Sequence, residues 1–210
     1  TASRILDCAC GIGTQALGFS RSGFWTVGSD LSRRATGRAA REAARRELAA
    51  AFLVSDMRAL AVADGAFDAV VALDNALPHL PTTADHRAAV GSMADACREG
   101  GMVMVSVRDY SAALAEKPVT EPPRVWGEPG ERRVVLQIWT WLDDRCYELV
   151  HVTGREEGEE WRFATRTGRY RAVLVEEVAD AFRRAGLTAV ETLPPSESGY
   201  YQPLILGFRR

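Results

Sequence analysis

Short apolar runs alternate with helix-like segments through the first half of the chain. The apolar runs span residues 5–8, 26–28, 51–54, 69–73 and 102–107. Helical spacing of apolar positions appears between them, over residues 14–20, 32–49 and 86–97. This alternation is typical of βαβ units, in which helices cover both faces of a parallel sheet. The first half therefore predicts an α/β fold with a doubly wound sheet.

The periodicity changes after a proline-rich, irregular stretch at residues 111–130. Apolar and polar residues then alternate with a period of two over 133–142, 146–153 and 161–167, which predicts a three-stranded antiparallel meander. Turns are expected at Asp143 and Asp144 and around residues 154–158. Helical spacing returns at 175–185, and two last strands are expected at 188–192 and 203–208. The whole pattern predicts a seven-stranded, mostly parallel sheet with the meander inserted after strand five.

Composition limits the partners of the chain. Its 210 residues suit one compact domain, and a hydrophobic fraction of 47% argues against disorder. The 26 basic and 28 acidic residues nearly cancel, whereas proteins that mainly grip nucleic acid or anionic membranes carry a basic excess. No apolar run approaches the ~18 residues of a membrane span. We therefore expect no nucleic-acid partner and no membrane.

The four cysteines, at positions 8, 10, 97 and 146, form neither zinc-type C-x-x-C pairs nor the density of a disulfide scaffold. They are expected to be free thiols, which favours a reducing, cytoplasmic location. Richness in alanine and arginine indicates a GC-rich bacterial genome.

The most informative motif is the run R-I-L-D-C-A-C-G-I-G-T-Q at residues 4–15. A predicted strand ends at Asp7, and a tight loop with Gly11 and Gly13 leads into a helix. Glycines let the backbone approach a ligand closely, and a helix N-terminus offers free N–H groups to an electron-rich atom. The dinucleotide-binding pattern G-x-G-x-x-G needs a third glycine where this chain has Ala16, so the fit to a nicotinamide-binding loop is incomplete.

The same run resembles motif I of the class I S-adenosylmethionine-dependent methyltransferases, D-x-[AG]-C-G-x-G. Two further acidic positions follow the order of that family. Asp30 ends the second predicted strand, where the family binds the ribose hydroxyls. Asp56 follows the third, where the family contacts the adenine amino group, with Met57 as a wall for the ring. The resemblance covers about residues 4–108 and, more loosely, the last helix and the last two strands.

This resemblance implies a Rossmann-like fold and S-adenosylmethionine as the methyl donor, with S-adenosylhomocysteine as the product. Two alternatives stay open, namely a glycine pair that only marks a tight turn and a nicotinamide-dependent oxidoreductase. The residues implied to bind the donor are Asp7, Ala9, Gly11, Gly13, Asp30, Leu31, Asp56, Met57, Leu73 and His79.

The segment A-L-D-N-A-L-P-H-L at residues 72–80 resembles the glycine and sarcosine N-methyltransferase group. That group has an asparagine and a histidine at the spacing of Asn75 and His79, and an arginine followed by an aromatic residue after strand five, as in Arg108 and Tyr110. By this resemblance Arg108 would hold a substrate carboxylate, since a guanidinium binds a carboxylate through two hydrogen bonds. Asn75 would orient the substrate near the methyl group, and His79 would face the donor. The Asn/Asp-Pro-Pro-aromatic motif of nucleic-acid amino methyltransferases is absent.

Asp74 departs from that group, which has a small residue at this position. Its carboxylate could pair with an ammonium substrate, obstruct a very small one or, like His79, accept a proton from the acceptor. Arg108 could instead pair with Asp109 or Asp74, Asn75 could satisfy the backbone of a sharp turn, and His79 could fill the loop. Asp74, Asn75 and Asp109 are also similar to the metal-binding trio of catechol O-methyltransferases, but their spacing is imperfect and we expect no metal.

The expected activity is methylation of a small molecule, namely N-methylation of an amino acid or another carboxylated amine. The alternatives are an O-methyltransferase of secondary metabolism and a non-catalytic donor-binding module. We expect residues 1–110 to form the donor-binding half, 111–170 to cover the substrate and 171–210 to complete the domain. A homo-oligomer is a possible assembly. A segment ahead of the first strand, which helps to enclose the site in the glycine-type enzymes, is expected to be missing.

Several smaller predictions concern single side chains. Trp139 and Trp141 suit either the core of the meander or a surface for a larger acceptor. Residues 200–202 (Tyr-Tyr-Gln) precede the last strand, either near the acceptor or at a surface corner. His86 is expected on the surface of its helix, and the acidic turn at 156–160 is expected in solvent.

Overall fold

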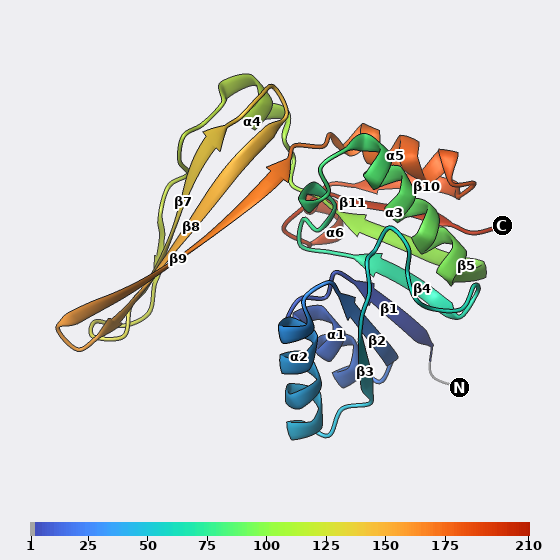
Figure 1. The fold of residues 1–210 in the computed structure, drawn as a ribbon, viewed down its shortest axis with the longest axis horizontal. Helices are drawn as coiled ribbons and strands as arrows, with labels where there is room; N and C mark the ends of the chain where they lie inside the picture. The colour runs from blue at the N-terminus through green and yellow to red at the C-terminus, as the bar shows by residue number, and fades with distance from the viewer. Residues whose placement is uncertain (1–2) are drawn as a thin grey trace. The chain divides into compact units, whose positions relative to one another are not determined.

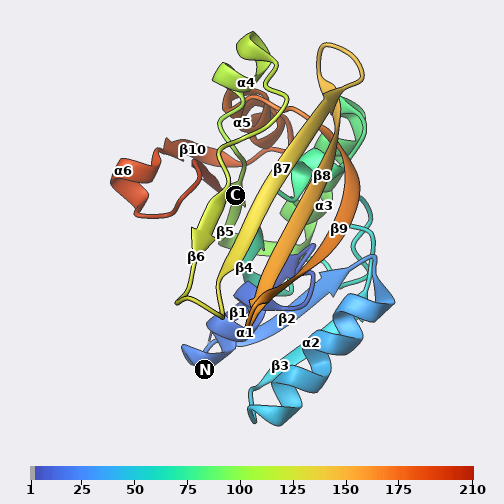
Figure 2. The same cartoon turned by 90° about the vertical axis from the view of Figure 1, so that its left-hand side faces the viewer.

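The computed structural model describes residues 3–210, and the chain divides into two compact units. Unit 1 extends to Asp109 and resumes over Leu174–Arg210, and unit 2 is Tyr110–Val173. Unit 1 contains a seven-stranded sheet and unit 2 a four-stranded sheet, both drawn in Figure 1 and Figure 2. Among the described residues no helix is long and apolar enough to cross a membrane.

The sheet of unit 1 has the strand order β10-β11-β5-β4-β1-β2-β3. Neighbouring strands from β1 to β5 run parallel, whereas β11 pairs antiparallel with both β5 and β10. The predicted seven-stranded, mostly parallel sheet is therefore confirmed. Its strands are β1 (Arg4–Cys8), β2 (Trp25–Asp30), β3 (Ala50–Val54), β4 (Phe67–Ala72), β5 (Cys97–Ser106), β10 (Thr188–Leu193) and β11 (Leu204–Phe208).

The helices of unit 1 form two packed pairs, α1 with α2 and α3 with α5. The strand order reverses between β1 and β4, and right-handed crossovers then place the helices of the two halves on opposite faces of the sheet. Ligands of such sheets bind at the carboxyl ends of the strands where the order reverses. The helices are α1 (Thr14–Arg21), α2 (Arg33–Arg45), α3 (Thr83–Ala96), α5 (Val175–Arg184), α6 (Pro195–Ser198) and the 3₁₀ helix η1 (Leu77–His79).

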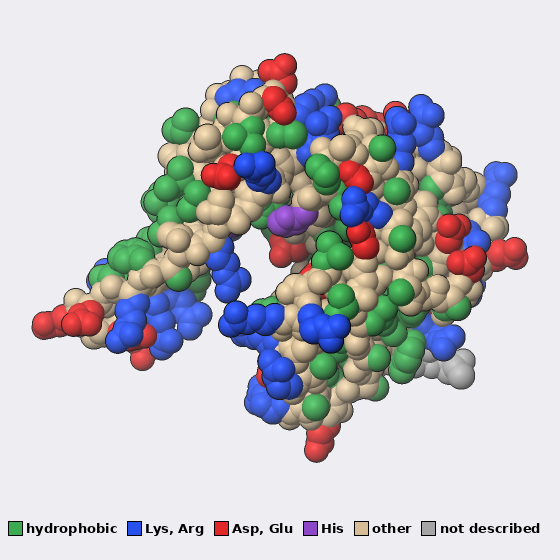
Figure 3. Space-filling model, viewed as in Figure 1, with side chains coloured by type: hydrophobic (Ala, Val, Ile, Leu, Met, Phe, Trp, Pro, Cys, Tyr) green, Lys and Arg blue, Asp and Glu red, His purple; other side chains and the backbone are tan. Residues whose placement is uncertain are grey.

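α2 is shorter than the predicted segment 32–49. The hydroxyl of Ser32 accepts a hydrogen bond from the Ala35 amide at 3.2 Å and caps its first turn. The helix ends at Arg45, because Glu47 adopts a left-handed φ of 54° that the helical spacing of alanines does not reveal. Exposed arginines give α2 a basic outer surface, which is visible in Figure 3.

The prediction that His86 lies on the surface is wrong. Its side chain is buried, and its Nε2 lies 3.2 Å from the carbonyl oxygen of Leu80. The N-cap residue Thr82 sets the phase of α3, and this phase turns the fourth helical residue inward. The imidazole therefore ties the start of α3 to the loop before it.

Unit 2 contains four antiparallel strands rather than the predicted three. They are β6 (Arg124–Trp126), β7 (Arg133–Trp141), β8 (Cys146–Glu157) and β9 (Glu160–Arg171), and the short helix α4 (Ser111–Glu116) precedes them. The turn at Asp143 and Asp144 is confirmed, and the turn expected around residues 154–158 lies at its far end, at Gly158 and Glu159, because β8 continues through Gly154. A Cβ at Gly154 would lie only 2.6 Å from Val134 and 2.7 Å from Phe163, so this glycine permits close strand packing instead of a turn.

Two side-chain clusters stabilise unit 2. Trp139 is 2% exposed and stacks on Tyr147 with ring centroids 4.3 Å apart, which supports the core interpretation for this tryptophan. The hydroxyl groups of Tyr147 and Tyr110 lie 2.7 Å apart in the same cluster.

The prediction of a solvated acidic turn is wrong for Glu156, because its carboxylate is buried and accepts two hydrogen bonds from the Arg132 guanidinium at 2.6 and 2.8 Å.

Candidate functional site

The loop between β1 and α1 combines unusual backbone geometry with close packing. Ala9, Gly11 and Gly13 all have left-handed φ angles, of 55°, 55° and 87°. A Cβ added to Gly13 would lie 2.9 Å from the Cβ of Ala39, so this glycine lets the loop approach α2. A Cβ on Gly11 would meet no atom within 4 Å. The loop thus turns sharply and leaves open space on the side of Gly11.

Asp30 holds that loop in position from the end of β2. Its Oδ2 accepts a hydrogen bond from the Gly11 amide at 2.9 Å, and its Oδ1 accepts one from the Ser32 amide at 2.8 Å. Each carboxylate oxygen can accept further hydrogen bonds. Asp30 is therefore both an anchor for the glycine loop and an oriented acceptor for the hydroxyl groups of a ligand.

Asp7 is the next-to-last residue of β1 and is 2% exposed. Its Oδ2 has no hydrogen-bond partner among residues 3–210. Burial raises the pKa of this carboxyl from 3.8 to about 7, and the nearby charge of Asp30 acts in the same direction. An unpartnered buried oxygen beside an open space is a position where a cationic or N–H-bearing ligand group would be stabilised.

Asp56 follows β3 and is bound by Arg58. The Arg58 guanidinium donates to both carboxylate oxygens at 2.6 to 3.1 Å, and it also donates to Asp85 at 2.8 Å. These hydrogen bonds hold the pKa of Asp56 below its ordinary value, so the carboxylate remains ionised. Arg58 thereby links the loop after β3 to the first turn of α3.

A cavity of about 500 Å³ lies at this end of the sheet, and all the predicted donor-binding residues except Gly13 line it. Gly13 instead packs against α2. Asp74 and His79 also line the cavity, whereas Asn75 and Arg108 are not among its lining residues. The full lining is Asp7, Ala9, Cys10, Gly11, Ile12, Thr14, Gln15, Asp30, Leu31, Ser55, Asp56, Met57, Leu73, Asp74, Ala76, His79 and Leu80.

Several lining residues were not predicted from the sequence. Ile12 is 45% exposed, so it offers an apolar wall to a ligand. Thr14 and Gln15 begin α1, where free backbone N–H groups are expected. An apolar residue between two loop glycines was the available signal for Ile12, since such a side chain cannot be buried by the loop itself.

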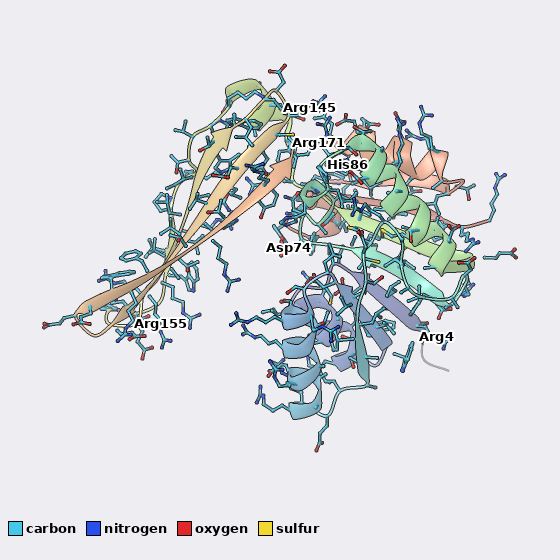
Figure 4. The ribbon with its side chains drawn as sticks, viewed as in Figure 1. Arg4, Asp74, His86, Arg145, Arg155 and Arg171 are labelled. Carbon is cyan, nitrogen blue, oxygen red and sulfur yellow. The ribbon has the colours of Figure 1, made fainter. Side chains whose placement is uncertain are left out.

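The turn after β4 brings Asp74 and Asn75 together in the left-handed region, with φ of 59° and 64°. Asn75 Oδ1 accepts a hydrogen bond from the Arg108 amide at 2.9 Å, which ties this turn to the end of β5. The backbone-satisfying role considered for Asn75 is therefore present. Figure 4 labels Asp74 beyond the carboxyl end of β4. No group of three or more His, Cys, Asp or Glu side chains within residues 3–210 is arranged to hold a metal ion.

Comparison with known proteins gives three kinds of match. A family model described as "Methyltransferase domain" matches residues 5–101. Glycine N-methyltransferase of Homo sapiens is 30% identical over 126 residues, a match that covers 53% of this chain and 43% of that protein. The chain thus spans less than half the length of the curated relatives that it matches.

Solved structures match the whole chain. The crystal structure of Streptomyces venezuelae DesVI has a TM-score of 0.81 and 26% sequence identity, and the match covers 100% of this chain and 84% of that one. CalS10, described as an amino pentose methyltransferase from Micromonospora echinaspora, has the same TM-score and coverage at 23% identity, which shows the shared fold. Residues 5–101 thus match a methyltransferase domain, and the whole chain shares the fold of solved methyltransferases, in agreement with the S-adenosylmethionine-dependent methyltransferase family that its sequence predicts.

Proposed function

We propose that the chain transfers the methyl group of S-adenosylmethionine to the nitrogen of a small amine, with an amino acid or another carboxylated amine as the acceptor. The observation that carries this proposal is the cavity at the carboxyl ends of β1 to β4, whose lining includes Asp7, Asp30, Asp56 and Asp74. Acidic walls suit a cationic donor and an amine acceptor. The match to glycine N-methyltransferase supports nitrogen as the methylated atom.

The donor fits the residues that line the cavity. Asp30 would accept the ribose hydroxyls, because two backbone amides already orient its carboxylate. Asp56 and Met57 would hold the adenine, the first by hydrogen bonding and the second by apolar contact. The unpartnered Oδ2 of Asp7 would accept a hydrogen bond from the ammonium group of S-adenosylmethionine. Burial raises the pKa of this carboxyl to about 7, and the positive charge of the ammonium group would favour its ionised form. Bound S-adenosylmethionine supplies a methyl group that is already activated on a sulfonium.

The tasks left to the chain are alignment and exclusion of water. Orienting two bound reactants can contribute up to ~7–11 kcal/mol to the lowering of a barrier. Asp74 and His79 lie where the cavity meets the end of β4, and either could accept the proton that the acceptor nitrogen must lose. Arg108 would bind the acceptor carboxylate. Its backbone amide is fixed by Asn75, so the arginine side chain starts from a defined point.

The predicted role of residues 111–170 as a substrate cover stays a prediction, and so does the possible homo-oligomer. Two other functions stay open, namely an O-methyltransferase and a donor-binding module without activity. Binding and methyl-transfer assays distinguish them from the proposed N-methyltransferase.

Thermal unfolding with S-adenosylhomocysteine tests donor binding, with NAD as the control ligand. At 100 times its dissociation constant the product should stabilise the chain by about 2.7 kcal/mol, and NAD should have no effect. Mass spectrometry then detects methyl transfer to amino acids, other amines and hydroxyl compounds. Transfer to carboxylated amines supports the proposal. Transfer to hydroxyl groups alone would favour the O-methyltransferase, and binding without any transfer would favour the inactive module.

A further inference from the structure

The segment between α6 and β11 lies at the end of β5. β11 pairs antiparallel with β5, and its first residue, Leu204, is the partner of Ser106, the last residue of β5. Residues 200–203 precede Leu204 and therefore lie at the carboxyl end of the parallel strands. The cavity lies at this same end of the sheet.

A chain of hydrogen bonds joins this segment to Asp74. The Asp74 amide donates to the hydroxyl of Ser106 at 2.7 Å, and that hydroxyl donates to Oε1 of Gln202 at 2.9 Å. The Tyr201 hydroxyl donates to Oδ1 of the Asp74 carboxylate. Ser106 is fully buried and Gln202 is 7% exposed, so both are rigid anchors. Two elements from distant parts of the sequence thus hold the backbone and the side chain of Asp74.

The backbone at Asp74 needs this support. With φ of 59° it adopts a left-handed conformation that L-residues seldom occupy, and Asn75 repeats it. Residues in such conformations persist where surrounding contacts hold them, and they concentrate at functional sites. The left-handed conformation of Asp74 therefore indicates that this residue has a functional role.

Tyr201 is suited to hold the carboxylate rather than the fold. Tyr201 is 61% exposed, so packing in the protein core does little to fix its side chain. Partial burial of the hydroxyl and its bond to Asp74 raise the pKa of Tyr201 above its ordinary value, so the phenol stays protonated and donates. The ring of Tyr200 packs beside it, with centroids 4.8 Å apart. Asp74 keeps lone pairs for another donor, and it lines the cavity.

We propose that Asp74 and Tyr201 form the amine-recognition pair of the acceptor site. Asp74 accepts a hydrogen bond from an N–H of the acceptor, and it favours a cationic ammonium over a neutral hydroxyl group. Tyr201 is the positioning residue, because it fixes which carboxylate oxygen faces the acceptor. This inference rests on the proposed methyltransferase function and adds its specificity for amines.

The test compares Asp74→Asn, Tyr201→Phe and the control Glu197→Gln, which removes an exposed carboxylate from the preceding helix α6. Each variant is assayed with amino acids and amino sugars and with their hydroxyl counterparts. In Asp74→Asn the acceptor loses a charged hydrogen bond, and we expect KM for amines to rise about 10- to 100-fold. In Tyr201→Phe the carboxylate loses the bond that orients it, and we expect a smaller rise of about 3- to 10-fold. S-adenosylhomocysteine affinity and the unfolding temperature should stay at wild-type values in all three variants.

Each other outcome has a distinct meaning. Unchanged KM for amines in Asp74→Asn and Tyr201→Phe would overturn the recognition pair and leave the proposed amine methylation standing. If Asp74→Asn loses S-adenosylhomocysteine binding while its KM for amines is unchanged, Asp74 contacts the methyl donor and not the acceptor. That result would also overturn the recognition pair. If the unmodified protein methylates hydroxyl acceptors and no amine, both the recognition pair and the proposed function are overturned.

Discussion

Replacing Asp7 by asparagine should stabilise the free chain at neutral pH while weakening donor binding. The wild-type carboxyl is 2% exposed, its Oδ2 has no partner in the described part of the chain, and burial raises its pKa from 3.8 to about 7. Asparagine keeps the shape of the side chain and removes the charge. The substitution therefore reports the cost of burying this charge, which the hydrogen bond from the Ala16 backbone offsets only in part.

The sign of the effect follows from proton binding. Between pH 4 and 7 the folded state keeps the Asp7 proton that the unfolded state has lost, so stability falls as pH rises. One bound proton gives a slope of ~1.36 kcal/mol per pH unit. Over the interval from 3.8 to about 7 the loss reaches about 4 kcal/mol, and it is absent below pH 4.

Urea unfolding of the ligand-free chain between pH 4 and 8.5 measures this effect. We expect the difference in unfolding free energy between Asp7→Asn and wild type to grow by about 4 kcal/mol across that range in favour of the variant. Asp64→Asn, which neutralises an exposed aspartate of unit 1, should follow the wild-type curve. Calorimetry should show S-adenosylhomocysteine binding about 10- to 100-fold weaker in Asp7→Asn, the scale of one lost charged hydrogen bond. Parallel stability curves for Asp7→Asn and wild type would refute the reasoning.

Three further substitutions test separate parts of the site. Asp30→Ala removes the acceptor of the Gly11 and Ser32 amides, and we expect calorimetry to show S-adenosylhomocysteine binding weakened about 100-fold. Gly13→Ala adds a Cβ 2.9 Å from that of Ala39 at a φ of 87°, so chemical denaturation should show a loss of about 1–3 kcal/mol. Arg108→Ala should raise KM for carboxylated amines at least 10-fold and leave KM for amines without a carboxylate unchanged in steady-state assays.

Much of unit 1 could be predicted because its strands are short apolar runs bounded by turn residues. A strand buried on both faces has little freedom in its composition, so β1, β4 and β5 are visible as apolar segments. The donor side of the cavity could be predicted for a related reason. Acidic residues stand at or just beyond the carboxyl ends of β1, β2 and β3, and the order of parallel strands brings these ends together.

Unit 2 was harder to predict because both faces of its sheet are partly polar and its turns lack a unique signal. Gly154 illustrates the difficulty, since glycine indicates a turn and equally permits close contact with Val134 and Phe163 inside a strand. The burial of Glu156 depends on the Arg132 guanidinium, which lies 24 positions away in the sequence and reaches it only in the folded sheet. Local periodicity carries no information about such pairs.

The acceptor side depends on a different kind of information. Six residues other than glycine have a positive φ in the described part of the chain, and three of them, Ala9, Asp74 and Asn75, follow β1 and β4. Those two strands flank the point where the strand order reverses, so strained backbone is concentrated where the fold binds ligands. The bonds from Ser106 and Tyr201 that hold Asp74 span 32 and 127 positions. A sequence pattern can identify a carboxylate after a strand, but only the closed sheet determines which residues orient it, and this orientation is what would distinguish an amine from a hydroxyl acceptor.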